Sequence, residues 1–198
     1  MIKTIIFDYA GVLTPTNNHL LFAVKHHKRF KLTIDELMTK FYLNWKDATV
    51  NKESDLAFWN ELSKDLKIKT DELRNLVIKT FPLDQRMLEI IDKIKDKYKI
   101  MMMSNQVESW LEKVIEENNL RKKFHYFVNS YHVNIRKPDE GIFKIALETS
   151  KSKSSETLFI DDKVENINAA RTLGIQVILF ENFEQFRSEF SKFVKVDE

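Results

Sequence analysis

Short, almost uniformly apolar segments recur along the chain and predict five β-strands. They comprise residues 4–7, 100–103, 126–128, 157–160 and 177–180. Uninterrupted apolar segments of this length are typical of parallel strands that are covered on both faces. Amphipathic helical patterns lie between most of them. This alternation predicts an α/β fold built on a Rossmann-like, doubly wound parallel sheet.

The helical patterns carry signals for where the helices begin, end and pack. Pro138 is expected at the first position of one helix, and Gly174 just beyond the end of another. The last helix carries an aromatic stripe at spacings of three, four and three, formed by Phe183, Phe186, Phe190 and Phe193. Such a stripe indicates a helix face packed in the core.

The interval between the first two predicted strands is too long for a simple crossover. More than ninety residues separate Asp8 from Ser104, whereas a whole βαβ unit needs about 30 residues. We therefore expect an inserted, all-helical cap domain at residues 15–82. The core domain then comprises residues 1–14 and 83–198, and its first helix covers residues 84–97.

Capping patterns support a helical insertion. Thr33 and Glu36 have the spacing of a capping box, in which each side chain bonds the main chain of the other. Ser54 and Thr70 each precede an apolar helical pattern, so both are expected to cap helices. The insertion should therefore contain at least three helices.

Composition and charge exclude several classes of protein. Among the 198 residues, 32 are basic and 30 acidic, so no broad positive surface for nucleic acid is expected. The absence of cysteine excludes disulfide scaffolds and thiolate nucleophiles. The first apolar segment is too short for a signal peptide or a membrane span. We expect a cytoplasmic protein, monomeric or weakly dimeric, that binds neither nucleic acid nor membranes.

Polar side chains follow the predicted strands where ligands bind in doubly wound sheets, beyond the carboxyl ends. They are the acidic, hydroxyl, amide and amine groups of Asp8, Ser104, Asn105, Lys137, Asp161 and Asp162. Carboxylates suit a divalent cation, and an amine with a hydroxyl suits a phosphoryl group. Convergence of these groups predicts a metal-assisted phosphoryl site.

Each of these residues also has a purely structural interpretation. Ser104 and Asn105 are common in turns, and Asp161 with Asp162 could cap a helix. Lys137 alone is an ordinary surface lysine. The five histidines show no ligand spacing and are interpreted as surface or packing residues. Only the combination in sequence order points to chemistry.

That combination resembles the four motifs of the haloacid dehalogenase (HAD) superfamily of hydrolases. The stretch Asp8-x-Ala10-Gly11-Val12 resembles motif I, Ser104 motif II and Lys137 motif III, and motif IV is matched by Asp161-Asp162-x-x-x-Asn166. The insertion stands where the C1 cap of this superfamily stands. The chain looks especially like the sugar-phosphatase-like subfamily and the N-terminal phosphatase domain of soluble epoxide hydrolase.

The resemblance implies a role for each motif residue. Asp8 would be the nucleophile that forms an aspartyl-phosphate. Mg²⁺ would be held by Asp8, the main-chain carbonyl of Ala10 and Asp162, with support from Asp161 and Asn166.

The remaining motif residues would bind the phosphoryl group and the substrate. Ser104 would donate a hydrogen bond to a phosphoryl oxygen. Lys137 would contact the phosphoryl group and keep Asp8 ionised. Main-chain N–H groups near Gly11 would complete the cradle, and Asn105 would face the substrate.

The sequence departs from the family pattern at Ala10. Hydrolysing relatives usually have aspartate there, which protonates the leaving group and activates water. A methyl group does neither, and general acid–base catalysis is commonly worth about 10²–10⁴-fold. The sugar-phosphatase-like subfamily accepts a non-acidic residue at this position. We therefore predict a Mg²⁺-dependent hydrolase of a small phosphorylated metabolite, acting on a phosphate monoester.

Three other hypotheses stay open. A haloacid dehalogenase needs no leaving-group proton and no metal, although Asp161 and Asp162 fit it poorly. A phosphonoacetaldehyde hydrolase also has alanine at this position and uses a cap lysine as a Schiff base; the insertion offers Lys25, Lys28, Lys40 and Lys46. The chain could also be a catalytically silent protein that binds phosphate or another protein.

Overall fold

A five-stranded parallel sheet forms the centre of the protein. The computed structural model describes residues 1–16, 19–43, 45–52 and 54–196. The strands pair in the order β3-β2-β1-β4-β5. They are β1 (Thr4–Phe7), β2 (Lys99–Ser104), β3 (Tyr126–Asn129), β4 (Thr157–Asp161) and β5 (Gln176–Leu179). The predicted fold class and all five strands are confirmed, each strand end to within one residue.

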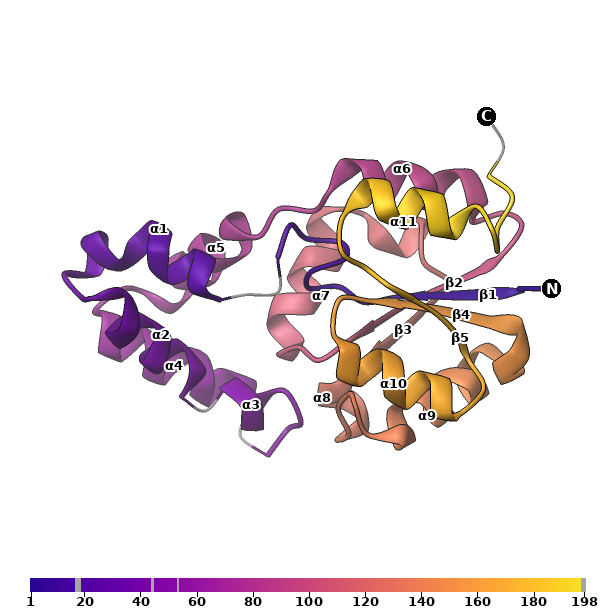
Figure 1. Ribbon diagram of the computed structural model, residues 1–198. Helices are drawn as coiled ribbons and strands as arrows, with labels where there is room; N and C mark the ends of the chain where they lie inside the picture. Colours follow the sequence, from indigo (N-terminus) through magenta and orange to yellow (C-terminus); the bar gives the residue numbers. More distant parts are fainter. Residues whose placement is uncertain (17–18, 44, 53, 197–198) are drawn as a thin grey trace.

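Helices cover both faces of this sheet (Figure 1). The central strand β1 directs Ile5 and Phe7 into one apolar core and Ile6 into the other. The first face is covered by α6 (Gln85–Ile94), α7 (Glu108–Glu117) and α11 (Phe183–Phe190). The second is covered by α8 (Ser130–Val133), α9 (Glu140–Ser150) and α10 (Val164–Thr172). Two 3₁₀ turns, Leu120–Lys122 and Ser154–Glu156, complete the core.

The aromatic stripe near the end of the chain packs in the core as predicted. The ring of Phe7 lies 6.5 Å from that of Phe186 and 6.4 Å from that of Phe190. The helix ends at Phe190, so Phe193 lies beyond it, partly buried against the same core. Gly174 follows α10 with φ +77°, as expected of a residue just past a helix end.

Two predicted helix starts are wrong. Helix α9 begins at Glu140, because the Asp139 side chain accepts a hydrogen bond from the main-chain N–H of Gly141 and caps the helix. Pro138 therefore precedes the cap and, after a cis peptide bond, lies outside the helix. Thr70 is the first residue of α5, and its hydroxyl turns towards Asn60 and Ser63 instead of capping.

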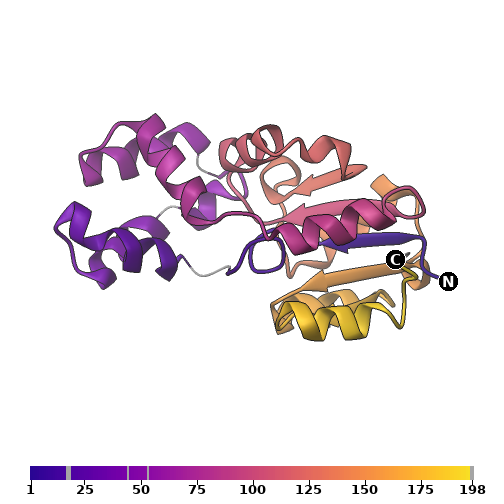
Figure 2. The same cartoon turned by 90° about the horizontal axis from the view of Figure 1, so that it is seen from above.

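The long insertion is helical and lies beyond the carboxyl ends of the strands (Figures 1 and 2). It contains α1 (Leu20–Phe30), α2 (Ile34–Tyr42), α3 (Trp45–Ala48), α4 (Asp55–Leu66) and α5 (Thr70–Thr80). Thr33 and Glu36 form the predicted capping box, and Ser54 caps α4. The exact domain boundaries at residues 15 and 82 stay a prediction. No described helix has the length and apolar character that crossing a membrane requires.

Trp110 on α7 joins the insertion to the core. Its ring lies 6.2 Å from Phe41, 6.2 Å from Trp59 and 5.7 Å from Phe81. Polar contacts reinforce this junction, since the Asp55 carboxylate accepts hydrogen bonds from the main-chain N–H and the hydroxyl of Ser109 at 2.7 and 2.9 Å. The helices of the insertion are thereby held over the strand ends.

Replacing this junction residue should destabilise the protein strongly. Trp110 is only 2% exposed, so Trp110→Ala leaves a large cavity and should lower the free energy of unfolding by about 3–5 kcal/mol. Leu56→Ala is the control, because Leu56 is 59% exposed and should change that free energy by less than about 0.5 kcal/mol. Urea unfolding measures both; a Trp110→Ala loss as small as the control would contradict the packing described.

Candidate active site

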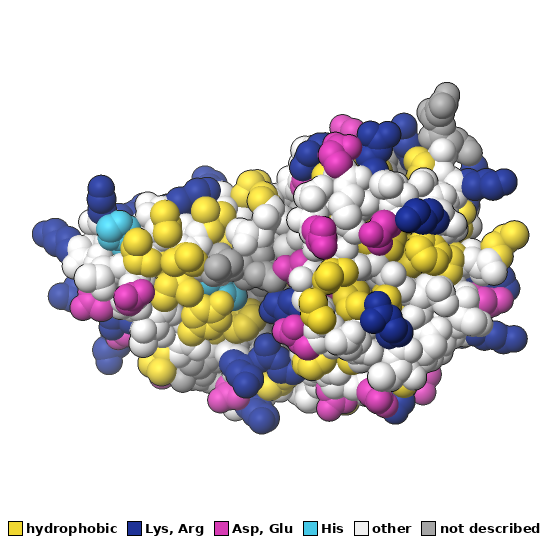
Figure 3. Space-filling model, in the orientation of Figure 1, with side chains coloured by type: hydrophobic (Ala, Val, Ile, Leu, Met, Phe, Trp, Pro, Cys, Tyr) yellow, Lys and Arg dark blue, Asp and Glu magenta, His cyan; other side chains and the backbone are white. Residues whose placement is uncertain are grey.

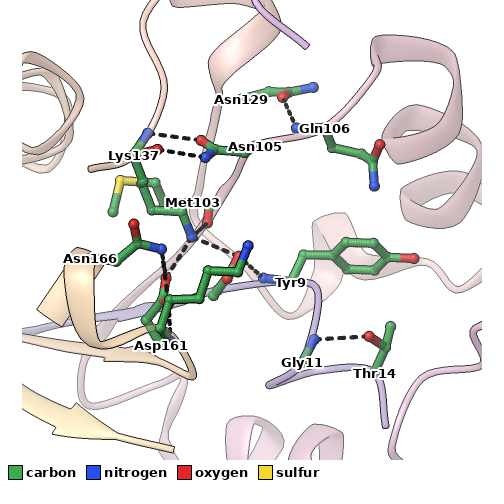
Figure 4. A network of polar contacts seen from close by, with 12 residues as sticks. Tyr9, Gly11, Thr14, Met103, Asn105, Gln106, Asn129, Lys137, Asp161 and Asn166 are labelled. Carbon is green, nitrogen blue, oxygen red and sulfur yellow. Dashed lines mark hydrogen bonds and ion pairs between the residues drawn. The ribbon is translucent and has the colours of Figure 1, made fainter. Parts of the chain in front are cut away.

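Lys137 lies at the centre of a buried polar cluster at the carboxyl ends of the strands (Figure 4). Its Nζ is 2.7 Å from Oδ1 of Asp8 and 2.7 Å from Oδ2 of Asp161. It also donates a hydrogen bond to the main-chain carbonyl of Met103 at 3.2 Å. The sheet register explains the meeting of the two acids: Phe7 pairs with Ile160, so Asp8 and Asp161 follow from adjacent positions.

Asp161 and Asp8 are each held by further hydrogen bonds. Both carboxylate oxygens of Asp161 accept from Nδ2 of Asn166, at 2.9 and 3.0 Å, and Oδ1 accepts from the main-chain N–H of Lys163 at 2.8 Å. Oδ1 of Asp8 accepts from the main-chain N–H of Tyr9 at 2.6 Å. Asn166 therefore fixes the orientation of the acid that contacts Lys137.

A third carboxylate, that of Asp162, completes a possible metal site. Asp8, Asp161 and Asp162 each offer an oxygen, and these oxygens lie within 4.8 Å of one another. Gly11 allows this approach, because a Cβ at Gly11 would lie 2.4 Å from Oδ2 of Asp162, and its φ of +93° favours glycine. The N–H of Gly11 already donates to the Thr14 hydroxyl at 3.1 Å.

Burial disfavours the charged forms of the acids in this cluster. It raises the pKa of Asp8 to about 8, while Lys137 lowers this pKa and Asp161 raises it. It also raises the pKa of Asp162 to about 6, with Asp161 adding to the rise. Burial alone would lower the pKa of Lys137, but Asp161 and Asp8 together raise it. Lys137 thus favours ionised Asp8 as predicted, yet burial outweighs it. Three carboxylates around one ammonium fit a divalent cation.

A cavity of about 230 Å³ opens above these strand ends, between the sheet and the insertion. Asp8, Ser104 and Lys137 line its floor. The other lining side chains of the core are Ala10, Asn105, Gln106, Arg136, Lys163 and Asn166, and those of the insertion are His19, Tyr42, Trp45 and Lys46. The structure therefore brings the predicted site residues of all four motifs to one place.

Asn105 contacts the main chain of Lys137 at both ends of its carboxamide. Oδ1 accepts from the N–H of Lys137 and Nδ2 donates to its carbonyl, both at 2.9 Å. These bonds fix the backbone from which the Lys137 side chain extends. A direct contact of Asn105 with substrate stays a prediction.

Sequence reasoning missed the cavity walls. Nothing in the sequence singled out Trp45, Arg136 or Lys163 as lining the site. His19 was interpreted as a surface or packing residue; it is buried, with ring centroids 4.8 Å from Phe41 and 4.7 Å from Trp45, and also lines the cavity. Tyr9 and Trp110 do not line this cavity but a neighbouring void of about 10 Å³, which shares Ala10, His19 and Gln106 with it.

Known proteins resemble this chain over nearly its full length or over part of it. It is 28% identical to D-ribitol-5-phosphate phosphatase of Bacteroides thetaiotaomicron, over 96% of this chain and 98% of that protein. Bifunctional epoxide hydrolase 2 of Sus scrofa is 33% identical over 73 residues, which cover 37% of this chain and 13% of that protein.

Solved structures share the fold. A HAD-like hydrolase from Porphyromonas gingivalis superposes with a TM-score of 0.78 at 24% identity, covering 97% of each chain. A HAD-family enzyme from B. thetaiotaomicron, in complex with magnesium and inorganic phosphate, superposes with a TM-score of 0.74 at 21% identity, covering 90% of this chain and 93% of that one.

The family model for haloacid dehalogenase-like hydrolases matches residues 5–180, which extend from β1 through the insertion to just beyond β5. This match includes Asp8, Ser104, Lys137, Asp161 and Asp162, the residues that meet beneath the cavity. The chain therefore belongs to the haloacid dehalogenase-like hydrolase family.

Proposed function

We propose that this protein is a Mg²⁺-dependent phosphatase that hydrolyses a small phosphate monoester through an aspartyl-phosphate on Asp8. The observation that carries the proposal is the position of Lys137, 2.7 Å from both Asp8 and Asp161, beside a third carboxylate. The full-length resemblance to a sugar-alcohol phosphatase and the magnesium–phosphate complex of a structural neighbour support it.

Mg²⁺ would be held by Asp8, Asp162 and the main-chain carbonyl of Ala10. When bound, it neutralises the carboxylates and the phosphoryl oxygens that would otherwise repel one another. Asp161 has a different task in this arrangement: it orients Lys137 and is itself oriented by Asn166.

Asp8 is the group that reacts. One carboxylate oxygen forms a bond to phosphorus while the ester P–O bond breaks, and the alcohol oxygen leaves with the bonding electron pair. Lys137 and Ser104, both on the cavity floor, stabilise the phosphoryl oxygens. Water then attacks phosphorus, and the bond between phosphorus and the Asp8 oxygen breaks. Inorganic phosphate leaves with the oxygen of that water, and the Asp8 carboxylate is restored.

Ala10 leaves the departing alkoxide without a proton donor at this position. The alkoxide must then take its proton from water, which disfavours esters of weakly acidic alcohols. The protein should therefore act faster on esters with stable leaving groups, such as aryl phosphates, than on alkyl phosphates.

The first test is hydrolysis of p-nitrophenyl phosphate with and without Mg²⁺. Asp8→Asn should lower kcat at least about 10³-fold, because an amide is a poor nucleophile, and chelation by EDTA should abolish activity until Mg²⁺ is restored. Asp65→Asn, an acid on α4 that lies away from the cavity lining, is the matched control. Activity that survives either Asp8→Asn or chelation would refute the mechanism.

Restoring an acid at position 10 should raise turnover of alkyl phosphates. Ala10→Asp supplies the missing proton donor, so kcat for D-ribitol 5-phosphate should rise at least about tenfold, and more than kcat for p-nitrophenyl phosphate. Ala10→Asn is the control, because it adds the same bulk without an acidic proton. If both variants raise kcat equally, or if neither raises it, proton donation at this position does not limit the reaction.

One observation favours a second candidate, a phosphonate hydrolase. Among Lys25, Lys28, Lys40 and Lys46 of the insertion, it is Lys46 that lines the cavity. Ala10 also matches the alanine that phosphonoacetaldehyde hydrolases have at this position. The Lys46 amine would condense with the substrate aldehyde, releasing water, and the imine would accept the C–P bonding pair as Asp8 attacks phosphorus. The resulting enamine would take up a proton at carbon to give an imine, whose hydrolysis would free the lysine and acetaldehyde. Water would hydrolyse the aspartyl-phosphate to inorganic phosphate and the Asp8 carboxylate.

Borohydride trapping with phosphonoacetaldehyde distinguishes the two reactions. Under the phosphatase proposal, mass spectrometry should show no reduced adduct on Lys46. An adduct that is present in the unaltered protein and absent from Lys46→Met would replace the phosphatase proposal with the phosphonate reaction.

A further inference from the structure

The cavity carries more positive charge than a single phosphoryl group uses. Its lining contains one carboxylate, Asp8, and four cationic side chains. Lys137 forms ion pairs with Asp8 and Asp161 and serves the reacting phosphoryl group. The other three cations are Lys46, Arg136 and Lys163. No carboxylate of residues 1–16, 19–43, 45–52 or 54–196 lies within 4.0 Å of their side-chain nitrogens. Within that part of the chain, these three side chains therefore have no ion pair. Lys and Arg side chains also gather where the insertion meets the core on the face seen in Figure 3.

Arg136 is the best placed of these cations. It is half-buried, and Nη1 donates to the main-chain carbonyl of Lys46 and the hydroxyl of Thr49, both at 3.4 Å. Its guanidinium lies over the Trp45 ring, 5.7 Å from the centroid. These contacts come from α3 and the residue just beyond it, so the insertion holds the guanidinium at the cavity wall.

The partners of Arg136 do not neutralise it. A carbonyl, a hydroxyl and an indole face are uncharged, and burial lowers the pKa of Arg136 against the weaker effect of Asp47. The remaining guanidinium donors make no hydrogen bond to any described residue. A planar guanidinium with free donors matches the two oxygens of a carboxylate or phosphate better than it matches a sugar hydroxyl.

Chain connectivity places the Arg136 guanidinium close to the proposed reaction centre. Arg136 and Lys137 are consecutive, yet Lys137 contacts the nucleophile while Arg136 contacts the insertion. Both line the same cavity of about 230 Å³, below the range of about 300–1,000 Å³ for drug-sized ligands. A molecule that spans them must be short, with one end at Asp8 and the other at Arg136.

We infer that the substrate carries a second anionic group, a carboxylate or a second phosphate, which Arg136 binds together with Lys46 and Lys163. The inference rests on the proposed phosphatase function and narrows it to phosphate monoesters of small acids or to small bisphosphates. The three cations are specificity-determining residues, separate from the groups that act on phosphorus.

Matched substrate pairs test this inference. The values of kcat/KM are compared for glycerol 3-phosphate against 3-phosphoglycerate, D-ribitol 5-phosphate against D-ribonate 5-phosphate, and D-ribulose 5-phosphate against D-ribulose 1,5-bisphosphate. The anionic member of at least one pair should be preferred at least about tenfold, since a charge-assisted hydrogen bond is worth about that much. The pair that shows the preference identifies the anion as carboxylate or phosphate.

Variants assign the preference to Arg136. Arg136→Met should remove most of it, and Arg136→Lys should keep part of it, because the charge stays but the planar donors are lost. Lys25→Met is the control: it removes one positive charge from an exposed position on α1, away from the cavity, and should leave the preference intact. An equal loss in Arg136→Met and Lys25→Met would mean that overall charge attracts anions, and would overturn the assignment.

Two further measurements distinguish a failure of the second anionic group from a failure of the phosphatase function. If p-nitrophenyl phosphate is hydrolysed but no pair shows a preference, the second anionic group is refuted and the phosphatase function stands. If no ester is hydrolysed, the phosphatase function fails. Calorimetric binding of each pair to Asp8→Asn then decides the inference alone: tighter binding of the anionic members sustains it, and equal binding refutes it.

Discussion

Three carboxylates gathered in one place, two of them buried and one half-buried, are the constraint on which the rest of the structure depends. Lys137, the ammonium inside the cluster, contacts two of these acids, and the third, Asp162, offers an oxygen within 4.8 Å of theirs. The surroundings serve this arrangement. Asn105 fixes the backbone of Lys137, Asn166 fixes Asp161, and Gly11 leaves room for Asp162. A side chain that looks like a surface lysine in the sequence is thereby the organising charge of the site.

The insertion and the sheet contribute different properties to the cavity. The sheet supplies the reacting groups from the ends of its central strands, where parallel pairing holds them in register. The insertion supplies aromatic rings and one lysine, and it also supports the Arg136 guanidinium of the core. The proposed reacting groups thus come from the core alone, whereas the cavity wall is built by the core and the insertion together.

The sequence predicted what depends on local pattern and strand order. Uniformly apolar segments marked the strands, and Asp8, Ser104 and Asp161 followed directly from where those strands end. Competition between neighbouring residues was harder to predict: Asp139, not Pro138, sets the start of α9, and Thr70 bonds α4 instead of capping α5. The roles of Arg136 and Trp45 were beyond reach, because they arise only when the insertion folds back over the sheet.

Tyr9 links Asp8, the proposed nucleophile, to the junction between insertion and core. Its main-chain N–H donates to the Asp8 carboxylate, and its phenolic oxygen accepts from the indole N–H of Trp110 at 3.3 Å. Trp110 in turn contacts rings of α2, α4 and the segment after α5. The main chain of Tyr9 thus orients the Asp8 carboxylate while its side chain bears on the packing of the insertion. A displacement of either one would be transmitted to the other through this single residue.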